Sequence, residues 1–139
     1  MILYLDTSSL VKIYLAEAGS DEVQALVERA TVVTTSRIAY PEMRAAFGRR
    51  RREGTLRARD FAAAKRAFEA DWLTYVAVDV TAAICHEAGD LAERYRLRGF
   101  DGVHLASFAE MVRGVGGAEV RFSSHDHHLN RAAKAFARS

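Results

Sequence analysis

The sequence contains a single cysteine among its 139 residues, so no disulfide bond can form within the chain. This scarcity fits a reducing, cytoplasmic setting. One proline and the lack of any low-complexity tract argue against linkers and repeats. The apolar runs are far shorter than the roughly 20 residues of a membrane-spanning helix, and the N-terminal segment lacks the basic region of a signal peptide. The composition therefore predicts one globular domain over residues 1–139.

The net charge is also small, because 20 Lys and Arg residues face 18 Asp and Glu residues, for a formal charge of +2. This balance alone argues neither for nucleic acid nor for a membrane as partner. The distribution is uneven, however, since residues 43–66 contain nine basic and two acidic residues. Within this window four arginines are consecutive, namely Arg49, Arg50, Arg51 and Arg52. A basic segment thus interrupts an otherwise acidic chain.

Short apolar and β-branched runs alternate with longer amphipathic segments along the whole chain. Strands that alternate with helices pair in parallel through crossover connections, which predicts a three-layer α/β/α sandwich. Ser8 or Ser9 is expected to cap the first helix, and Gly99 to break the helical region that follows residue 82. The predicted strands cover residues 2–5, 32–35, 75–78 and 120–122, and the predicted helices cover 10–15, 20–27, 36–52, 56–72, 82–97, 101–113 and 127–137.

Four acidic residues are expected near the carboxyl ends of these strands, where ligands gather in parallel sheets. Asp6 directly follows the first strand, and Asp126 lies in the loop that leaves the last one. Glu42 and Asp101 lie near the starts of two helices. Carboxylates that share one crevice repel each other unless a cation neutralises them, and oxygen ligands suit Mg²⁺ or Mn²⁺. The pattern supports the hypothesis of metal-assisted phosphodiester hydrolysis.

Four segments around these acids resemble the motifs of a known family. In order and spacing they are similar to the four acidic motifs of PIN-domain ribonucleases, and most similar to those of the VapC toxins of bacterial and archaeal toxin–antitoxin pairs. Each motif alone is weak, whereas four in this order are specific. The segments are LDTSSLVK at 5–12, TTSRIAYPEM at 34–43, LRGFDGVHLAS at 97–107 and FSSHDHHLNRAA at 122–133, so the resemblance covers nearly the whole chain.

The resemblance implies a parallel sheet of four or five strands, dependence on Mg²⁺ or Mn²⁺, and endonucleolytic cleavage of RNA. It also implies a homodimer and a VapB-like antitoxin whose tail lies over the active-site groove. Carried over by position, Asp6 and Asp101 would bind the metal directly, and Glu42 and Asp126 directly or through water. Ser8 resembles the family's hydroxyl group next to the first acid.

Two positions depart from the family pattern, with Gly102 in place of the usual alanine and Ser124 in place of the commoner threonine. Neither change removes a carboxylate, so we expect the activity to be retained. The arginine run at 49–52 could bind RNA phosphates or an acidic antitoxin segment. Alternatively, the arginine run is a solvated helix end with no binding role.

Histidines also lie near two of the acids. His125, His127 and His128 surround the fourth acid and suggest zinc, but the further Cys or His ligands of a structural zinc site are lacking. A solvated or RNA-facing loop is the favoured interpretation. His104, three residues after Asp101, is expected to form a hydrogen bond with a neighbouring acid or carbonyl group.

Other functional classes stay open. A DNA-directed nuclease or another metal-dependent phosphohydrolase could use the same fold, and a catalytically weak PIN-like domain could bind only RNA or a partner. Such a binding domain would be free to lose the acids, and all four are present. A receiver-type signalling domain would show an adjacent acidic pair near the first strand and a lysine after the last one, and neither is evident.

Overall fold

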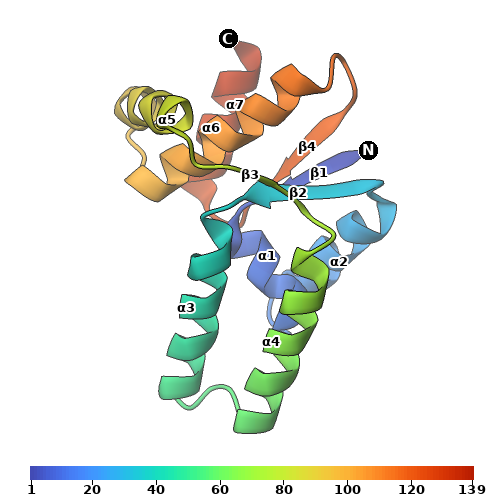
Figure 1. Ribbon diagram of the computed structural model, residues 1–139. Helices are drawn as coiled ribbons and strands as arrows, with labels where there is room; N and C mark the ends of the chain where they lie inside the picture. Colours follow the sequence, from blue (N-terminus) through green and yellow to red (C-terminus); the bar gives the residue numbers. More distant parts are fainter.

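A computed structural model describes residues 1–139, with strand β1 (Ile2–Leu5) at the centre of a four-stranded sheet (Figure 1). The strand order is β3-β2-β1-β4, and every neighbouring pair is parallel. This topology confirms the predicted parallel α/β architecture. The other elements are β2 (Val32–Ser36), β3 (Val76–Val78), β4 (Val120–Ser123), α1 (Thr7–Tyr14), α2 (Ser20–Arg29), α3 (Ala39–Arg52), α4 (Ala58–Trp72), α5 (Ala82–Tyr95), α6 (Gly99–Gly114) and α7 (His127–Arg138).

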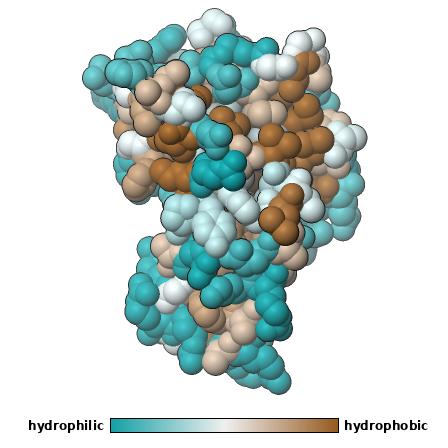
Figure 2. All heavy atoms as spheres, viewed as in Figure 1, coloured by the Kyte–Doolittle hydropathy of each residue, from teal (hydrophilic) through white to brown (hydrophobic).

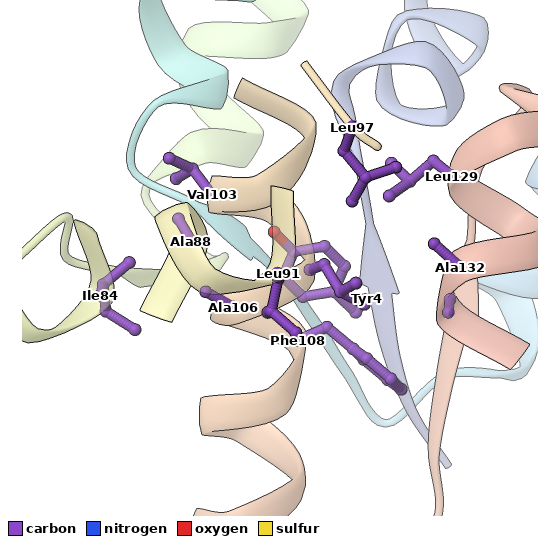
Figure 3. Packing of buried hydrophobic residues seen from close by; sticks show 12 residues of the cluster. Tyr4, Ile84, Ala88, Leu91, Leu97, Val103, Ala106, Phe108, Leu129 and Ala132 are labelled. Atoms are coloured by element: carbon purple, nitrogen blue, oxygen red, sulfur yellow. The ribbon is translucent and has the colours of Figure 1, made fainter. Parts of the chain in front are cut away.

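The alternation of side chains along β1 divides the core into two clusters, one on each face of the sheet. Tyr4 belongs to a cluster formed with α5, α6 and α7, which includes Leu91, Phe108 and Leu129 (Figure 3). Leu3 and Leu5 of β1 pack on the opposite face, against α1, α2, α3 and α4. Helices therefore cover both faces, and the carboxyl end of β1 opens between them.

Helices α3 and α4 run side by side away from the sheet as a projecting hairpin (Figure 1). Aromatic contacts hold the pair together, since the ring of Phe68 in α4 lies 5.9 Å from that of Phe47 and 5.7 Å from that of Tyr40. The far end of this hairpin is covered mostly by hydrophilic side chains (Figure 2). None of the seven helices combines the length and apolar character needed to cross a bilayer.

Two predicted helix boundaries are wrong. The cap of α1 is Asp6, not a serine, because the Asp6 carboxylate accepts the backbone N–H of Ser9 at 3.0 Å. The break before α6 falls at Arg96, which adopts the left-handed conformation with φ of 57°. Gly99 is instead the first residue of α6. Asp101 consequently lies in the first turn of α6 instead of beginning the helix, because Gly99 and Phe100 before it are already helical.

Candidate active site

Asp6 lies at the carboxyl end of β1 and is 3% exposed. Three donors surround its carboxylate: the hydroxyl of Ser8 at 2.7 Å and the backbone N–H of Ser9 at 3.0 Å reach Oδ1, and the hydroxyl of Ser124 at 2.6 Å reaches Oδ2. Burial raises the pKa of the Asp6 carboxyl above its usual range, although these hydrogen bonds act in the opposite direction. Asp6 is thus a buried acid held in one orientation.

The loop after β4 reaches the same point. The Ser124 hydroxyl that donates to the first acid also accepts the backbone N–H of Asp126 at 3.0 Å. The Ser8 hydroxyl accepts the backbone N–H of His125 at 2.8 Å. Asp126 itself caps α7, because Oδ1 accepts the N–H of Leu129 at 2.8 Å. Ser8, predicted only as a hydroxyl beside the first acid, therefore links the first turn of α1 to the loop after β4.

Glu42 lies in the first turn of α3, and its two carboxylate oxygens have different surroundings. Oε1 accepts hydrogen bonds from Thr7 Oγ1 at 2.5 Å and from His104 Nε2 at 3.0 Å, whereas Oε2 has no hydrogen-bond partner. Partial burial acts to raise the pKa of Glu42, but the hydrogen bonds from His104 and Thr7 outweigh it and hold this pKa below its usual value. Glu42 is consequently ionised at neutral pH.

Arg98 connects the remaining two acids. Its Nε lies 3.3 Å from Oδ2 of Asp101, and its Nη2 lies 3.5 Å from Oδ2 of Asp126. The Arg98 side chain is 81% exposed, so these ion pairs are weak and easily exchanged. Arg98, Glu42 and Asp101 also line a hollow of about 480 Å³, together with Phe100, a residue that is 62% exposed.

The four acids do not form a cluster in which three side chains already converge on one metal position. Ser124 connects Asp6 to Asp126, and Arg98 connects Asp126 to Asp101, whereas Thr7, the residue after Asp6, donates to Glu42 alone among the acids. The donor set nevertheless suits a hard divalent cation, because it offers only oxygen and includes the unpartnered Oε2 of Glu42. The guanidinium group bridges two carboxylates that a cation could equally neutralise. The residues present therefore fit Mg²⁺ or Mn²⁺.

The arginine run lies in the last turn of α3, two helical turns beyond Glu42, or about 12 Å along the axis at 1.5 Å per residue. Arg50 forms a 2.6 Å ion pair with Glu17, which attaches the hairpin to the segment between α1 and α2. Arg49 approaches Glu53 at 4.0 Å. The run is thus at the far end of the projecting hairpin rather than beside the acids.

The histidines near the fourth acid have separate partners. His125 Nδ1 lies 2.9 Å from the Ser9 hydroxyl, and His128 Nε2 lies 3.0 Å from the carbonyl oxygen of Tyr95. These hydrogen bonds occupy one ring nitrogen each of His125 and His128. His104 binds an acid, as predicted.

Sequence reasoning did not identify four residues that the structure brings to the site. Thr7 follows the first acid directly, and that adjacency was an available signal. The roles of Arg98 and Phe100 depend on where α6 begins, which the prediction misplaced. Tyr4 was visible only as an apolar strand residue, because its contact with His104 spans 100 positions of sequence.

The protein is a parallel α/β/α domain with an acid-lined hollow, and comparison with known proteins identifies its family. Residues 3–113 match the family model described as the PIN domain, a range that includes Asp6, Glu42 and Asp101. The chain is 40% identical over 106 residues to ribonucleases VapC45 and VapC49 of Mycobacterium tuberculosis, which covers 76% of this chain and 74% of each relative. The chain therefore belongs to the VapC group of PIN-domain ribonucleases.

A solved structure shows the same fold. The crystal structure of Mycobacterium tuberculosis VapC20, a sarcin–ricin loop cleaving toxin, matches with a TM-score of 0.64 over 94% of both chains. The sequence identity is 23%, so this likeness concerns the fold alone.

Proposed function

We propose that this protein is an endoribonuclease that depends on Mg²⁺ or Mn²⁺ and acts as the toxin of a VapBC-type toxin–antitoxin pair. The observation that carries the proposal is the shared hollow of Glu42 and Asp101, with Arg98 pairing Asp101 with Asp126 and Ser124 joining Asp126 to Asp6. The names of the curated relatives support ribonuclease activity. The family extends the proposal to a homodimer in the cytoplasm, inhibited by a VapB-like antitoxin.

Each acid has a role in this proposal. A bound divalent cation would supply an acidified water molecule and neutralise charge on the phosphate. Asp6 and Asp101 would hold it directly, and Glu42 and Asp126 directly or through water. A carboxylate oxygen not engaged with the cation would orient the attacking water and accept its proton. Ser8 and Ser124 keep Asp6 fixed, which lowers the cost of ordering the site.

Arg98 would bind substrate in the same scheme. A divalent cation would neutralise Asp101 and Asp126 in place of the guanidinium group that pairs with them here. The Arg98 guanidinium group would then be able to donate two hydrogen bonds to phosphate oxygens of the RNA. Arg98 would thus hold the substrate next to the carboxylates that it pairs with here.

Metal removal tests the proposal directly. We expect purified protein to cut total cellular RNA in Mg²⁺ or Mn²⁺, and excess EDTA to lower the rate by at least about 100-fold, because the acids alone cannot neutralise the phosphate. Sequencing of the new RNA ends gives the readout, and re-addition of Mn²⁺ should restore the same ends. Cleavage that persists in EDTA would exclude a metal-dependent mechanism.

The competing functions give different results in that assay. A DNA-directed nuclease would cut single-stranded DNA of matching sequence faster than the RNA. A domain that only binds RNA or a partner would produce no new ends in either metal. Separation of the two requires only that RNA and DNA be incubated in parallel with the same protein preparation.

The arginine run is proposed to bind RNA phosphates, since it concentrates charge on an exposed helix end. We expect the triple variant Arg49→Ala, Arg51→Ala and Arg52→Ala to bind RNA several-fold more weakly. The slope of the logarithm of the binding constant against the logarithm of the salt concentration should become shallower by roughly 0.7 per lost phosphate contact. Arg50 is kept because it pairs with Glu17. Fluorescence anisotropy in an Asp6→Asn background avoids cleavage. Unchanged affinity would leave the run as a solvated helix end.

A further inference from the structure

A continuous chain of hydrogen bonds connects the hydrophobic core to Glu42. The Tyr4 hydroxyl lies 2.8 Å from Nδ1 of His104, and Nε2 of the same ring lies 3.0 Å from Oε1 of Glu42. Tyr4 is 0% exposed and His104 2% exposed. The three residues come from β1, α6 and α3 and meet only in the folded protein.

The direction of these hydrogen bonds follows from the chemistry of the partners. An ionised carboxylate can only accept, so Nε2 of His104 carries the hydrogen that reaches Glu42. In a neutral imidazole Nδ1 is then an acceptor, and the Tyr4 hydroxyl is the donor. Burial raises the pKa of Tyr4 well above its usual value, which agrees with a hydroxyl that keeps its proton.

The ring of Tyr4 is itself fixed by packing. It stacks on Phe122 of β4 with a centroid distance of 5.7 Å and meets Phe108 of α6 edge-on at 6.0 Å. Figure 3 shows Tyr4 next to Phe108 within the buried cluster. The position of the hydroxyl group is therefore set by the core, and the orientation of the His104 ring is set by that hydroxyl.

The consequence appears at the carboxylate. Oε1 of Glu42 accepts from both Thr7 and His104, while Oε2 accepts from neither and belongs to the residue that lines the hollow with Asp101. A glutamate side chain left free would sample several rotamers, and ordering it on ligand binding costs free energy. Two donors on one oxygen remove that freedom in advance.

We propose that His104 is a positioning residue that holds Glu42 through Oε1 so that Oε2 is presented to the divalent cation, with the Tyr4 hydroxyl holding the orientation of the ring through Nδ1. This inference rests on the proposed function, because it assigns a role within the same site. Loss of a hydrogen-bond partner behind a metal-binding side chain typically lowers metal affinity about 10- to 100-fold.

The test uses Tyr4→Phe, which removes one hydroxyl group and leaves the ring packing intact. We expect Mn²⁺ affinity, measured by calorimetry on the folded protein, to fall roughly 3- to 10-fold, less than for a direct partner of Glu42. The kcat for RNA cleavage should fall while KM stays constant, since RNA does not contact the buried hydroxyl. Tyr95→Phe is the matched control, because the Tyr95 hydroxyl is buried without any partner.

A second pair of variants acts on the ring itself. His104→Leu removes the donor to Glu42 and should weaken Mn²⁺ binding by about 10-fold or more. His104→Gln keeps an N–H donor close to the place of Nε2 and should recover part of that loss. If His104 only filled space in the core, leucine would instead serve better than glutamine.

The outcomes separate this inference from the proposed function. Weaker Mn²⁺ binding in Tyr4→Phe but not in Tyr95→Phe supports the positioning role. A Tyr4→Phe protein that melts at a lower temperature yet binds Mn²⁺ like the wild type would overturn it and leave the proposed function standing. A wild-type protein that binds no Mn²⁺ and cuts no RNA would overturn both. Long-range ¹H–¹⁵N spectra should show His104 with its hydrogen on Nε2, and a hydrogen on Nδ1 alone would also overturn the role.

Discussion

Replacement of Asp6 by asparagine is expected to lower RNA cleavage by about 10³-fold or more and yet leave the protein at least as stable as the wild type. The loss of activity follows from removal of a carboxylate at the carboxyl end of β1, where a divalent cation would be held. The protein stays at least as stable because asparagine can still form the hydrogen bonds around this side chain and carries no buried charge.

The hydrogen-bond donors explain why asparagine fits. Its amide oxygen can accept from the Ser8 hydroxyl and the Ser9 backbone N–H, as Oδ1 of the aspartate does. Its amide N–H₂ would face Ser124, whose hydroxyl can accept as well as donate. The buried charge disappears, and with it the cost of removing that charge from water.

The pKa of Asp6 predicts how the stability difference depends on pH. Burial raises this pKa from the ordinary value of 3.8, so the folded state binds a proton more tightly than the unfolded chain. The stabilisation from this group is complete below the unfolded pKa and is lost as the pH rises through the folded pKa. In EDTA, Asp6→Asn should therefore gain stability over the wild type as the pH rises above the unfolded value of 3.8.

Thermal unfolding and mapped RNA ends together check this result. A variant that still cuts at the wild-type positions would remove Asp6 from the site. A variant that unfolds at a lower temperature than the wild type at neutral pH would show that the hydrogen bonds of the carboxylate outweigh its burial cost. Thermal unfolding of the same Asp6→Asn sample shows whether it is folded. Lost activity in a folded sample cannot be attributed to an unfolded protein.

Gly102→Ala is expected to destabilise the fold, even though the VapC family usually has alanine at the corresponding position. A Cβ atom at Gly102 would lie 2.6 Å from the carbonyl oxygen of Ala88 and 3.4 Å from the Cβ of Ala92. The contact at 2.6 Å involves backbone of α5, so one helix would have to move. Such overpacking costs about 1–3 kcal/mol, more than the roughly 1 kcal/mol that alanine contributes in a helix.

This substitution also reaches the site, because Gly102 directly follows Asp101. A shift of α6 would displace Asp101 and the exposed Arg98 that pairs with it. We therefore expect a melting temperature several degrees lower and weaker Mn²⁺ binding. Differential scanning calorimetry and a Mn²⁺ titration measure the two effects.

Gly89→Ala is the matched control, since Gly89 lies inside α5 and a Cβ there would meet nothing within 4 Å. Alanine should stabilise α5 at this position by up to about 1 kcal/mol. Opposite signs at the two glycines would confirm that α5 and α6 touch at Gly102. A Gly102→Ala protein as stable as Gly89→Ala would show that the helices can separate at no cost.

The amino-acid sequence predicts the class of the fold, which the structure confirms, and four candidate acids. Strands and helices can be predicted from the sequence because each pattern involves residues only a few positions apart. The alternation of strands with helices then predicts parallel pairing. The acids are candidates because Asp6 directly follows a strand and because all four stand within motifs that resemble a family. Local patterns of this kind can be recognised without a structure.

The way the candidate acids are held, and the residues that accompany them, depend on the tertiary structure. The contacts of Tyr4 with His104 and of Thr7 with Glu42 join positions 100 and 35 residues apart, and no periodicity encodes such a pairing. The arginine run, close to Glu42 in sequence, is carried away from it by the rise of a straight helix. Side-chain contacts of this kind depend on how whole elements pack, and the packing of α3 and α6 on β1 sets which oxygen of Glu42 stays free.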